Sequence, residues 1–365
     1  MITFTQTNSL NPFYFMKLLL LGIVSSLFLI SCSRDNKVKN VDRAFYFWSS
    51  NSYFDDDMKS SLKEVQSRKL YIKYFEVDYS EAMGNFPYEK TNFHTYDFYE
   101  ADSLLVVPTI FIKNEIFQYN TNATLDKLAD NIVFLVDKYN KERFSRLAES
   151  NFKEIQIDCD WTKSTKDKYF YLLKKIKELS QKEISCTLRL YPYKYSEIMG
   201  VPPVDKAMLM CYNLIKPLSE KDKNSILDVS ELKKYLNKFR EYPVHLDIAL
   251  PIFNWAHVYQ NNRFSGLVNL SSNEVSGFAK NTKPMWYEVT KDTVIYDVER
   301  IYFRVGDQIK CEDIKKATLD ETIAIIKQNV ALDDSTTITF FNLDNKTFNN
   351  YSYAEISDLF SSFTK

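Results

Sequence analysis

The stretch Glu154-Ile155-Gln156-Ile157-Asp158-Cys159-Asp160-Trp161-Thr162 has the pattern of a buried strand that ends in two carboxylates. Side chains alternate along a strand, so Asp158 and Asp160 share a face and Cys159 points the other way. Carboxylates at the C-terminal end of a strand are typical of catalytic residues in α/β barrels, and closely spaced pairs suit sugar cleavage. Asp is also common in turns and helix N-caps, so a structural role stays open for both residues.

Short apolar runs alternate with helical patterns along the rest of the chain, which is typical of βα units around a parallel sheet. The predicted strands are 44–48, 70–77, 104–112, 155–159, 184–191, 206–212, 244–250 and 337–343. The predicted helices are 57–67, 125–148, 166–180, 230–239, 319–329 and 353–363. This number and order of strands predict an α/β fold, a (β/α)8 TIM barrel.

Two irregular features accompany this pattern. Pro108 interrupts the third predicted strand, which predicts an irregular piece or a bulge because proline cannot donate a ladder hydrogen bond. After the seventh strand, residues from about 264–315 contain further strand-like runs, such as 293–298 and 301–305. We therefore expect a small β-rich insertion above the barrel mouth, the C-terminal ends of the strands, within a barrel domain of 43–365.

The composition is that of a globular chain without a strong charge. The 365 residues carry a net charge of −1, which excludes the broad basic field that holds nucleic acid, so no nucleic-acid partner is expected. The histidines are scattered and no Cys/His cluster has zinc-like spacing, so no metal and no cofactor is expected. Cys159, Cys186 and Cys211 lie in apolar strand-like runs, which predicts buried packing residues rather than disulfides.

The N-terminus has the pattern of a lipoprotein signal peptide. The apolar run at 18–30 is shorter than a typical membrane-spanning helix and is followed by Ser31-Cys32. A basic residue, a short apolar run and a small residue before Cys resemble a bacterial lipobox, in which the cysteine is acylated and becomes the new N-terminus. We therefore expect a signal peptide at 1–32, a polar tether at 33–42 and lipidation of Cys32. An ordinary signal peptide with a chance cysteine is the alternative.

This lipid anchor would attach the protein to a membrane of the bacterial cell envelope. The expected location is the outer membrane or the periplasmic face. The membrane is thus an expected partner, reached through the lipid on Cys32 rather than through a spanning helix.

Four short motifs resemble the chitinase-like glycoside hydrolases of family 18, and they fall on the expected strands in the expected order. On the fourth strand, Asp158-Cys159-Asp160-Trp161-Thr162 looks like the latter part of a family motif that often ends Asp-Trp-Glu. The other three are Met210-Cys211-Tyr212-Asn213 for Met-x-Tyr-Asp, Ala249-Leu250-Pro251-Ile252-Phe253-Asn254 for Gly-x-Pro-x-Tyr-Gly, and Phe341-Asn342-Leu343-Asp344 for a Trp ahead of Leu-Asp.

A second resemblance covers the fourth strand alone. Ile155-Gln156-Ile157-Asp158-Cys159-Asp160 is similar to the Ile-Gln-Ile-Asp-x-Asp strand of bacterial barrel lipoproteins of unknown function. Those barrels carry no established activity, so this closer match implies a fold and not a function.

The family resemblance implies roles for individual residues and exposes departures, with Ile155 at the earliest Asp of the fourth-strand motif and Asn213 in place of an Asp. The terminal Glu of the family motif protonates the glycosidic oxygen, and the neighbouring Asp, here Asp160, orients the N-acetyl group of the substrate. The tyrosine of the sixth strand, here Tyr212, hydrogen-bonds that acetamide. Thr162 stands where the Glu would be. A hydroxyl has far too high a pKa to act as the general acid near neutral pH.

Three functions therefore stay open. In the first, the protein is a glycoside hydrolase in which Asp158 and Asp160 work with an acid from the second strand, Glu76 or Asp78, which alternation places on one face. In the second, it binds a glycan without cleaving it, and in the third it is a structural envelope lipoprotein. A further carboxyl group in the cleft near Thr162 would distinguish the first function from the second.

A glycan groove would need aromatic and polar side chains at the barrel mouth. The candidates are Trp48, Trp161, Tyr212, Asn213, Trp255 and Phe341. Trp255 and Trp286 lie in loop or insertion contexts, so we expect them to be the more exposed tryptophans. Core packing is the alternative for each aromatic residue.

Overall fold

The computed structural model describes residues 38–48, 54–91, 104–144, 147–296, 300–344 and 346–365. The expected signal peptide, the lipidation site Cys32 and the first half of the expected tether lie outside the described residues. Within the described part, no helix combines the length and the apolar character needed to cross a membrane.

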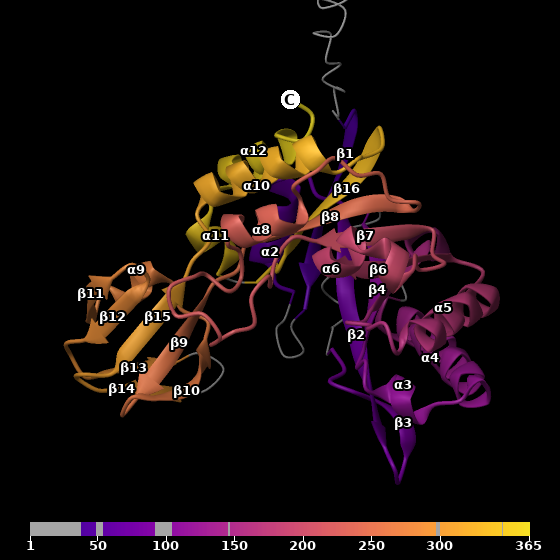
Figure 1. The fold of residues 1–365 in the computed structure, drawn as a ribbon, viewed down its shortest axis with the longest axis horizontal. Helices are drawn as coiled ribbons and strands as arrows, with labels where there is room; N and C mark the ends of the chain where they lie inside the picture. Colours follow the sequence, from indigo (N-terminus) through magenta and orange to yellow (C-terminus); the bar gives the residue numbers. More distant parts are fainter. Residues whose placement is uncertain (1–37, 49–53, 92–103, 145–146, 297–299, 345) are drawn as a thin grey trace, which may run out of the picture. The chain divides into compact units, whose positions relative to one another are not determined.

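Parallel strands close into a barrel, as the sequence predicted (Figure 1). β1 pairs with β2 on one side and with β16 on the other, so the first and last barrel strands meet. The barrel strands are β1 (Asn40–Phe47), β2 (Lys69–Ser80), β4 (Leu105–Ile112), β5 (Glu154–Asp158), β6 (Glu183–Arg189), β7 (Lys206–Met210), β8 (His245–Pro251) and β16 (Ser335–Phe341). They follow one another around the barrel in chain order, which confirms the TIM-barrel prediction.

Helices pack around the barrel because each presents an apolar face to the strands. The clearest case is α5 (Lys166–Ser180), which buries Tyr169, Leu172, Leu173 and Ile176 at helical spacing. It lies beside α4, and the two are neighbours in Figure 1. The other helices are α2 (Asp56–Glu64), α3 (Ile116–Tyr119), α4 (Asn122–Arg143), α6 (Leu190–Lys194), α7 (Ser196–Met199), α8 (Val229–Tyr235), α10 (Lys316–Asn329), α11 (Thr347–Asn350) and α12 (Tyr353–Ser361).

The cysteines of the described chain are packing residues. Cys159, Cys186, Cys211 and Cys311 are all free and buried. The prediction for the first three is therefore confirmed, and none of the four pairs in a disulfide.

The irregularity expected at Pro108 lies on the neighbouring strand instead. The register between β2 and β4 shifts between Lys73 and Phe75, so β2 carries one extra residue, Tyr74, opposite the step from Thr109 to Ile110. β4 itself is continuous from Leu105 to Ile112. Beyond the barrel, β2 continues and pairs antiparallel with β3 (Gly84–Tyr88).

This bulge decides which β2 side chains point into the barrel. Tyr74 and Phe75 are consecutive, yet both are buried outside the barrel interior, where the Tyr74 hydroxyl donates to Asn140 of α4 (2.7 Å). The alternation therefore shifts by one residue, and Lys73 and Glu76 come to share the inner face. Their side chains form an ion pair of 2.8 Å.

A β-rich insertion separates β8 from α10. It contains a five-stranded antiparallel sheet in the order β10-β9-β15-β12-β11, a separate hairpin of β13 and β14, and the short helix α9. The bounds are β9 (Trp255–Gln260), β10 (Arg263–Val268), α9 (Ser272–Val275), β11 (Ala279–Lys283), β12 (Trp286–Val289), β13 (Thr293–Tyr296), β14 (Arg300–Phe303) and β15 (Gln308–Glu312). The insertion has its own apolar core, and its sheet begins at Trp255, earlier in the chain than expected.

Candidate functional site

Asp158 is the last residue of β5, at the mouth of the barrel. The hydroxyl of Thr187 on β6 donates to its carboxylate (2.6 Å). Burial raises the pKa of Asp158 to about 6, and the nearby charges of Asp160 and Glu76 act in the same direction, while the Thr187 bond and Arg189 oppose them. Asp158 is therefore a carboxyl group that gains its proton as the pH falls through about 6.

Asp160 is held by an arginine that the sequence analysis missed. Arg189, the last residue of β6, donates from Nε (2.7 Å) and Nη2 (3.1 Å) to the two oxygens of Asp160. Its Nη1 also donates to the backbone oxygen of Asn213 (3.4 Å). Burial lowers the pKa of Arg189, but the bond to Asp160 more than offsets this and the net pKa is raised. This bidentate geometry fixes the position of both Asp160 oxygens.

A sequence signal could have pointed to Thr187 and Arg189 as residues of the mouth, although their pairing depends on the register of the two strands. Thr187 and Arg189 are two residues apart at the end of β6, the same spacing as Asp158 and Asp160 at the end of β5. Neighbouring parallel strands end at the same edge of a sheet. The pair at the end of β5 therefore lies next to the pair at the end of β6.

Tyr212 and Asn213 follow β7 and contribute polar atoms that have no partner. Tyr212 is 2% exposed, and its ring stacks on Phe341 at 5.3 Å. Burial, followed by the charge of Asp158, raises the pKa of its phenol well above the ordinary value. The Tyr212 hydroxyl and the Asn213 side-chain oxygen are buried without a hydrogen bond among the described residues. Buried polar atoms of this kind are costly unless something bonds them.

Both residues line a pocket of about 530 Å³ at the mouth. Asp160 and Arg189 form its polar side, and apolar side chains form the opposite wall. These apolar residues are Trp161, Leu190, Tyr191, Pro192, Ile198, Met199, Met210, Leu214 and Tyr235. Among the carboxylates of the described chain, only Asp160 lines this pocket.

The aromatic residues expected to bind a glycan divide into two groups. Phe341 lies at the centre of the mouth, with its ring 5.5 Å from that of Tyr46 and 5.8 Å from that of the half-buried Trp48. Trp255 is also half-buried, and its Nε1 donates to Glu312 (2.6 Å). These residues keep partly accessible surfaces around the mouth.

Two tryptophans, Trp161 and Trp286, are buried, and only for Trp286 does this contradict the expectation. Trp161 is only 5% exposed, because its ring packs against Tyr169 and Phe170 of α5, although its edge reaches the pocket. The prediction that Trp286 is exposed is wrong. It is 6% exposed and donates from Nε1 to the backbone oxygen of Lys221 (3.0 Å), so it packs between the insertion and the loop after β7.

The two relocated acids considered from the sequence are both paired with lysines. Glu76 accepts from Lys73 (2.8 Å), and Asp78 accepts from Lys113 (2.6 Å). The Lys113 bond lowers the pKa of Asp78. Neither residue lines the pocket beside Thr162. Glu76 is nevertheless close enough to raise the pKa of Asp158 by its charge.

Glu312 of β15 is a third carboxylate near the mouth, and it is fully buried. It accepts from Ser225 (2.5 Å), Trp255 (2.6 Å) and Lys310 (2.6 Å). Burial acts to raise the pKa of Glu312, but these donors together with His257 lower it to about 2. Glu312 therefore stays ionised and fixes the insertion to the barrel rather than supplying a proton.

Thr162 takes part in the start of α5. Its backbone N–H donates to the Thr165 hydroxyl (2.9 Å), and its own hydroxyl lies 3.0 Å from that of Ser164. Its carbonyl accepts from the backbone of Lys166 (2.9 Å). The position of the family acid is thus occupied by a residue that closes a turn before a helix.

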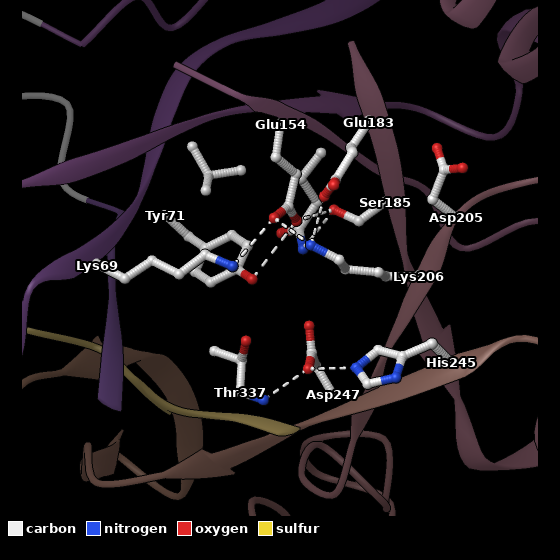
Figure 2. Close-up of polar contacts among 12 residues, drawn as sticks. Lys69, Tyr71, Glu154, Glu183, Ser185, Asp205, Lys206, His245, Asp247 and Thr337 are labelled. Carbon is white, nitrogen blue, oxygen red and sulfur yellow. Dashed lines mark hydrogen bonds and ion pairs between the residues drawn. The ribbon is translucent and has the colours of Figure 1, made fainter. Parts of the chain in front are cut away.

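The opposite end of the barrel, where the strands begin, carries a paired charge cluster (Figure 2). Glu154, the first residue of β5, accepts from Ser185 (2.6 Å), Lys69 (3.0 Å) and Lys206 (3.4 Å). Nearby, Asp247 accepts from the backbone N–H of Thr337 (2.6 Å) and bonds His245 (3.2 Å). We call this set, together with Tyr71, the base cluster. Residues at this end of a TIM barrel usually serve stability.

The described residues contain no group of three or more His, Cys, Asp or Glu side chains placed to hold a metal ion. No family model matches the sequence. No curated protein matches it either.

Solved structures with the same barrel include glycan-active enzymes. The spore cortex-lytic enzyme SleL of Bacillus cereus matches with a TM-score of 0.53 and 14% identity, covering 90% of this chain and 75% of that chain. SleL of Bacillus megaterium QM B1551 matches with a TM-score of 0.52 and 12% identity, over 90% and 75% of the two chains. A chitinase from Bacteroides thetaiotaomicron matches with a TM-score of 0.52 and 11% identity, over 89% and 97%.

These similarities define the class of fold. The chain has the TIM-barrel fold of chitinase-like glycosidases, and at this identity the likeness concerns the fold alone. The expected barrel fold is therefore confirmed, and it is shared with a chitinase. The closer resemblance to barrels with an Ile-Gln-Ile-Asp-x-Asp strand stays a prediction.

Proposed function

We propose that this protein is a cell-envelope lipoprotein whose barrel binds a glycan through an acetamido group and does not cleave it. The observation that carries the proposal is a pair of unpartnered buried atoms, the Tyr212 hydroxyl and the Asn213 side-chain oxygen, on two residues that line the pocket at the mouth. The names of the structural neighbours, two spore cortex-lytic enzymes and a chitinase, support a glycan as the ligand class.

An acetamido group fits the unmet hydrogen-bonding capacity of this pocket. Its carbonyl accepts from the Tyr212 hydroxyl, and its N–H donates to the Asn213 oxygen or to Asp160. Its methyl group would lie against the apolar wall that includes Met210 and Leu214. Small-ligand sites are usually lined by apolar side chains, with a few polar groups that orient the ligand.

The absence of cleavage follows from the placement and pairing of the carboxylates, because Asp158, whose pKa is raised to about 6, does not line the pocket. Glycoside hydrolysis needs a carboxylic acid to protonate the leaving oxygen. Asp160 is ion-paired with Arg189, Asp78 with Lys113 and Glu76 with Lys73. Thr162 cannot replace the acid because its hydroxyl holds its proton too tightly.

A glycoside hydrolase is the second candidate, and the state of Asp158 favours it. The raised pKa of about 6 gives Asp158 a proton below that pH, and Glu76 lies near enough to influence it. In this alternative Asp158 would protonate the leaving oxygen and activity would decline as pH rises through about 6.

Calorimetric titration with chitin oligosaccharides and with deacetylated chitosan oligosaccharides of equal length tests the proposal. We expect the acetylated ligand to bind. Tyr212→Phe should weaken its affinity roughly tenfold, which is the effect of losing one hydrogen bond from the Tyr212 hydroxyl. Tyr193→Phe is the matched control, because the Tyr193 hydroxyl donates to Arg240 O (3.2 Å) outside the pocket. Equal affinity for the deacetylated ligand would contradict the proposal.

Product analysis by mass spectrometry separates the two candidates. Prolonged incubation of the acetylated ligand at pH 5 and pH 7 is expected to leave it intact. Cleavage at pH 5 that disappears in Asp158→Asn would establish the hydrolase instead, since pH 5 lies below the raised pKa of Asp158, about 6.

The lipid anchor rests on the run at 18–30 and on Ser31-Cys32. It would place the barrel at the outer membrane or the periplasmic face of a bacterial envelope. Metabolic labelling with palmitate is expected to mark the wild type and not Cys32→Ala. Equal labelling of the two proteins would rule out acylation at Cys32.

A further inference from the structure

A second pocket lies in the insertion, on the sheet face that is turned away from the barrel contacts. Lys310 of β15 is opposite His257 of β9, and its ammonium group donates to backbone oxygens of the loop after β7 at 2.8 and 2.6 Å. Val258 and Gln260 alternate with His257 along β9, so they point to the other face. There they line a pocket of about 770 Å³ that hairpin β13–β14 covers.

Two guanidinium groups at this pocket lack a carboxylate partner. Arg300 of β14 and Arg304 beyond it both line the pocket and are exposed. Neither forms an ion pair with any carboxylate among the described residues. The Arg300 guanidinium instead lies over the ring of Tyr302, 4.6 Å from its centre. This cation–π contact orients the group without neutralising its charge.

Hydrogen bonds within the insertion hold the rest of the pocket in place. The side-chain amide of Gln260 donates to the backbone oxygen of Tyr302 (2.7 Å) and to Asp307 (3.1 Å). Asp307 also accepts from the backbone N–H of Arg304 (2.9 Å), which closes the turn after β14. Apolar residues such as Val268 complete the lining. The two arginines therefore project from a braced hairpin.

We propose that this pocket is a second glycan site, one that binds an anionic polysaccharide through Arg300 and Arg304. A guanidinium fork matches the geometry of carboxylate and phosphate groups, and the pair outweighs the single charge of Asp307. Tyr302, which is 51% exposed, adds aromatic surface beside the Arg300 guanidinium, and Asn261 offers a planar polar group for hydroxyls. The proposal does not depend on the site at the mouth, from which it differs in residues and in ligand charge.

Affinity electrophoresis of the full barrel tests this site. Native gels would contain polygalacturonate, poly(glycerol phosphate) or, as the neutral control, methyl-esterified pectin. We expect retardation by a charged polymer, which identifies carboxylate or phosphate as the anion, and no retardation by the ester. Arg300→Gln/Arg304→Gln should reduce the affinity at least about tenfold, since charge-assisted hydrogen bonds exceed neutral ones in strength.

Two controls keep the result specific. Arg263→Gln removes one positive charge, against two in the test variant, from an exposed position of β10 that does not line the pocket, and it should retain binding. Tyr212→Phe should also retain it, because that variant affects only the site at the mouth. Thermal unfolding checks that each variant is folded. Absence of retardation by both charged polymers, equal retardation by the ester, or an equal loss in Arg263→Gln would overturn the proposal.

Discussion

The base and the mouth of the barrel differ in whether their buried polar groups form hydrogen bonds. At the base, Glu154 and Asp247 are surrounded by donors that lie within hydrogen-bonding distance. At the mouth, the hydroxyl of Tyr212 and the side-chain oxygen of Asn213 have no partner among the described residues. A satisfied network stabilises the fold, whereas unsatisfied atoms in a pocket are available to a ligand. Removal of a charge should therefore have opposite consequences at the two ends.

The largest effect is expected from Glu154→Ala at the base. It leaves the buried Lys69 ammonium without its carboxylate, and breaking a buried ion pair costs about 3–5 kcal/mol of unfolding free energy. Denaturant titration measures this loss. Glu183→Ala is the control, because Glu183 binds Lys206 from an exposed position and such pairs contribute less than about 1 kcal/mol. Equal losses in the two variants would mean that the base cluster is not a stabilising core.

At the mouth, Asp158→Asn is expected to stabilise the fold at neutral pH. The pKa of Asp158 is raised from 3.8 to about 6, so the folded state binds its proton more tightly than the unfolded state. Stability therefore falls as pH rises from about 4 to 6, and a pKa difference of this size between the two states corresponds to about 3 kcal/mol of unfolding free energy. The asparagine variant should lose this dependence.

Asp247→Asn gives the opposite sign at the base. The bonds to His245 and Thr337 more than offset burial and lower the pKa of Asp247, so its contribution is present above pH 3.8 and is lost as pH falls through the lowered value. This variant should be destabilised at neutral pH. Urea titrations of both asparagine variants at pH 4, 5, 6 and 7 would reveal whether the changes in unfolding free energy have opposite signs. If both variants are stabilised, the two ends of the barrel do not differ in this respect.

A smaller effect is expected from His245→Gln. Its bond to Asp247, and then that to Asp333, raise the pKa of His245 despite partial burial. The stabilisation is complete below the unfolded value of 6.5 and is lost as pH rises through the raised folded pKa. We expect a loss of about 1 kcal/mol at pH 6 and a smaller one at pH 9, since the pair is partly screened by solvent. A loss that is the same at both pH values would contradict the ion pair.

The smallest effect is expected from Tyr212→Phe, within about 0.5 kcal/mol of wild type, because its hydroxyl forms no hydrogen bond within the part of the chain that the structure describes. Tyr46→Phe is the matched change, since the Tyr46 hydroxyl donates to buried Gln156 (2.7 Å) and its removal should cost about 1 kcal/mol or more. Thermal unfolding compares the two. A larger loss in Tyr212→Phe would indicate a structural role for its hydroxyl.

Much of the architecture could be predicted from local patterns. The strand at 155–159 and the helix at 166–180 were recognised because alternation and 3.6-residue periodicity are properties of consecutive residues. The placement of Asp158 and Tyr212 at the mouth followed from strand order alone. The pairing of Asp160 with Arg189 did not, because the two residues are 29 positions apart and meet only when β5 and β6 are in register.

The sequence by itself determined the barrel, its strand order and the burial of the cysteines, since each depends on the apolar pattern of one segment at a time. Only the tertiary structure decided which polar groups are satisfied. The bulge at Tyr74 turns Lys73 and Glu76 to the same side, and docking of the insertion buries Trp286. These outcomes depend on register and contacts between segments distant in the chain, and no local periodicity encodes them.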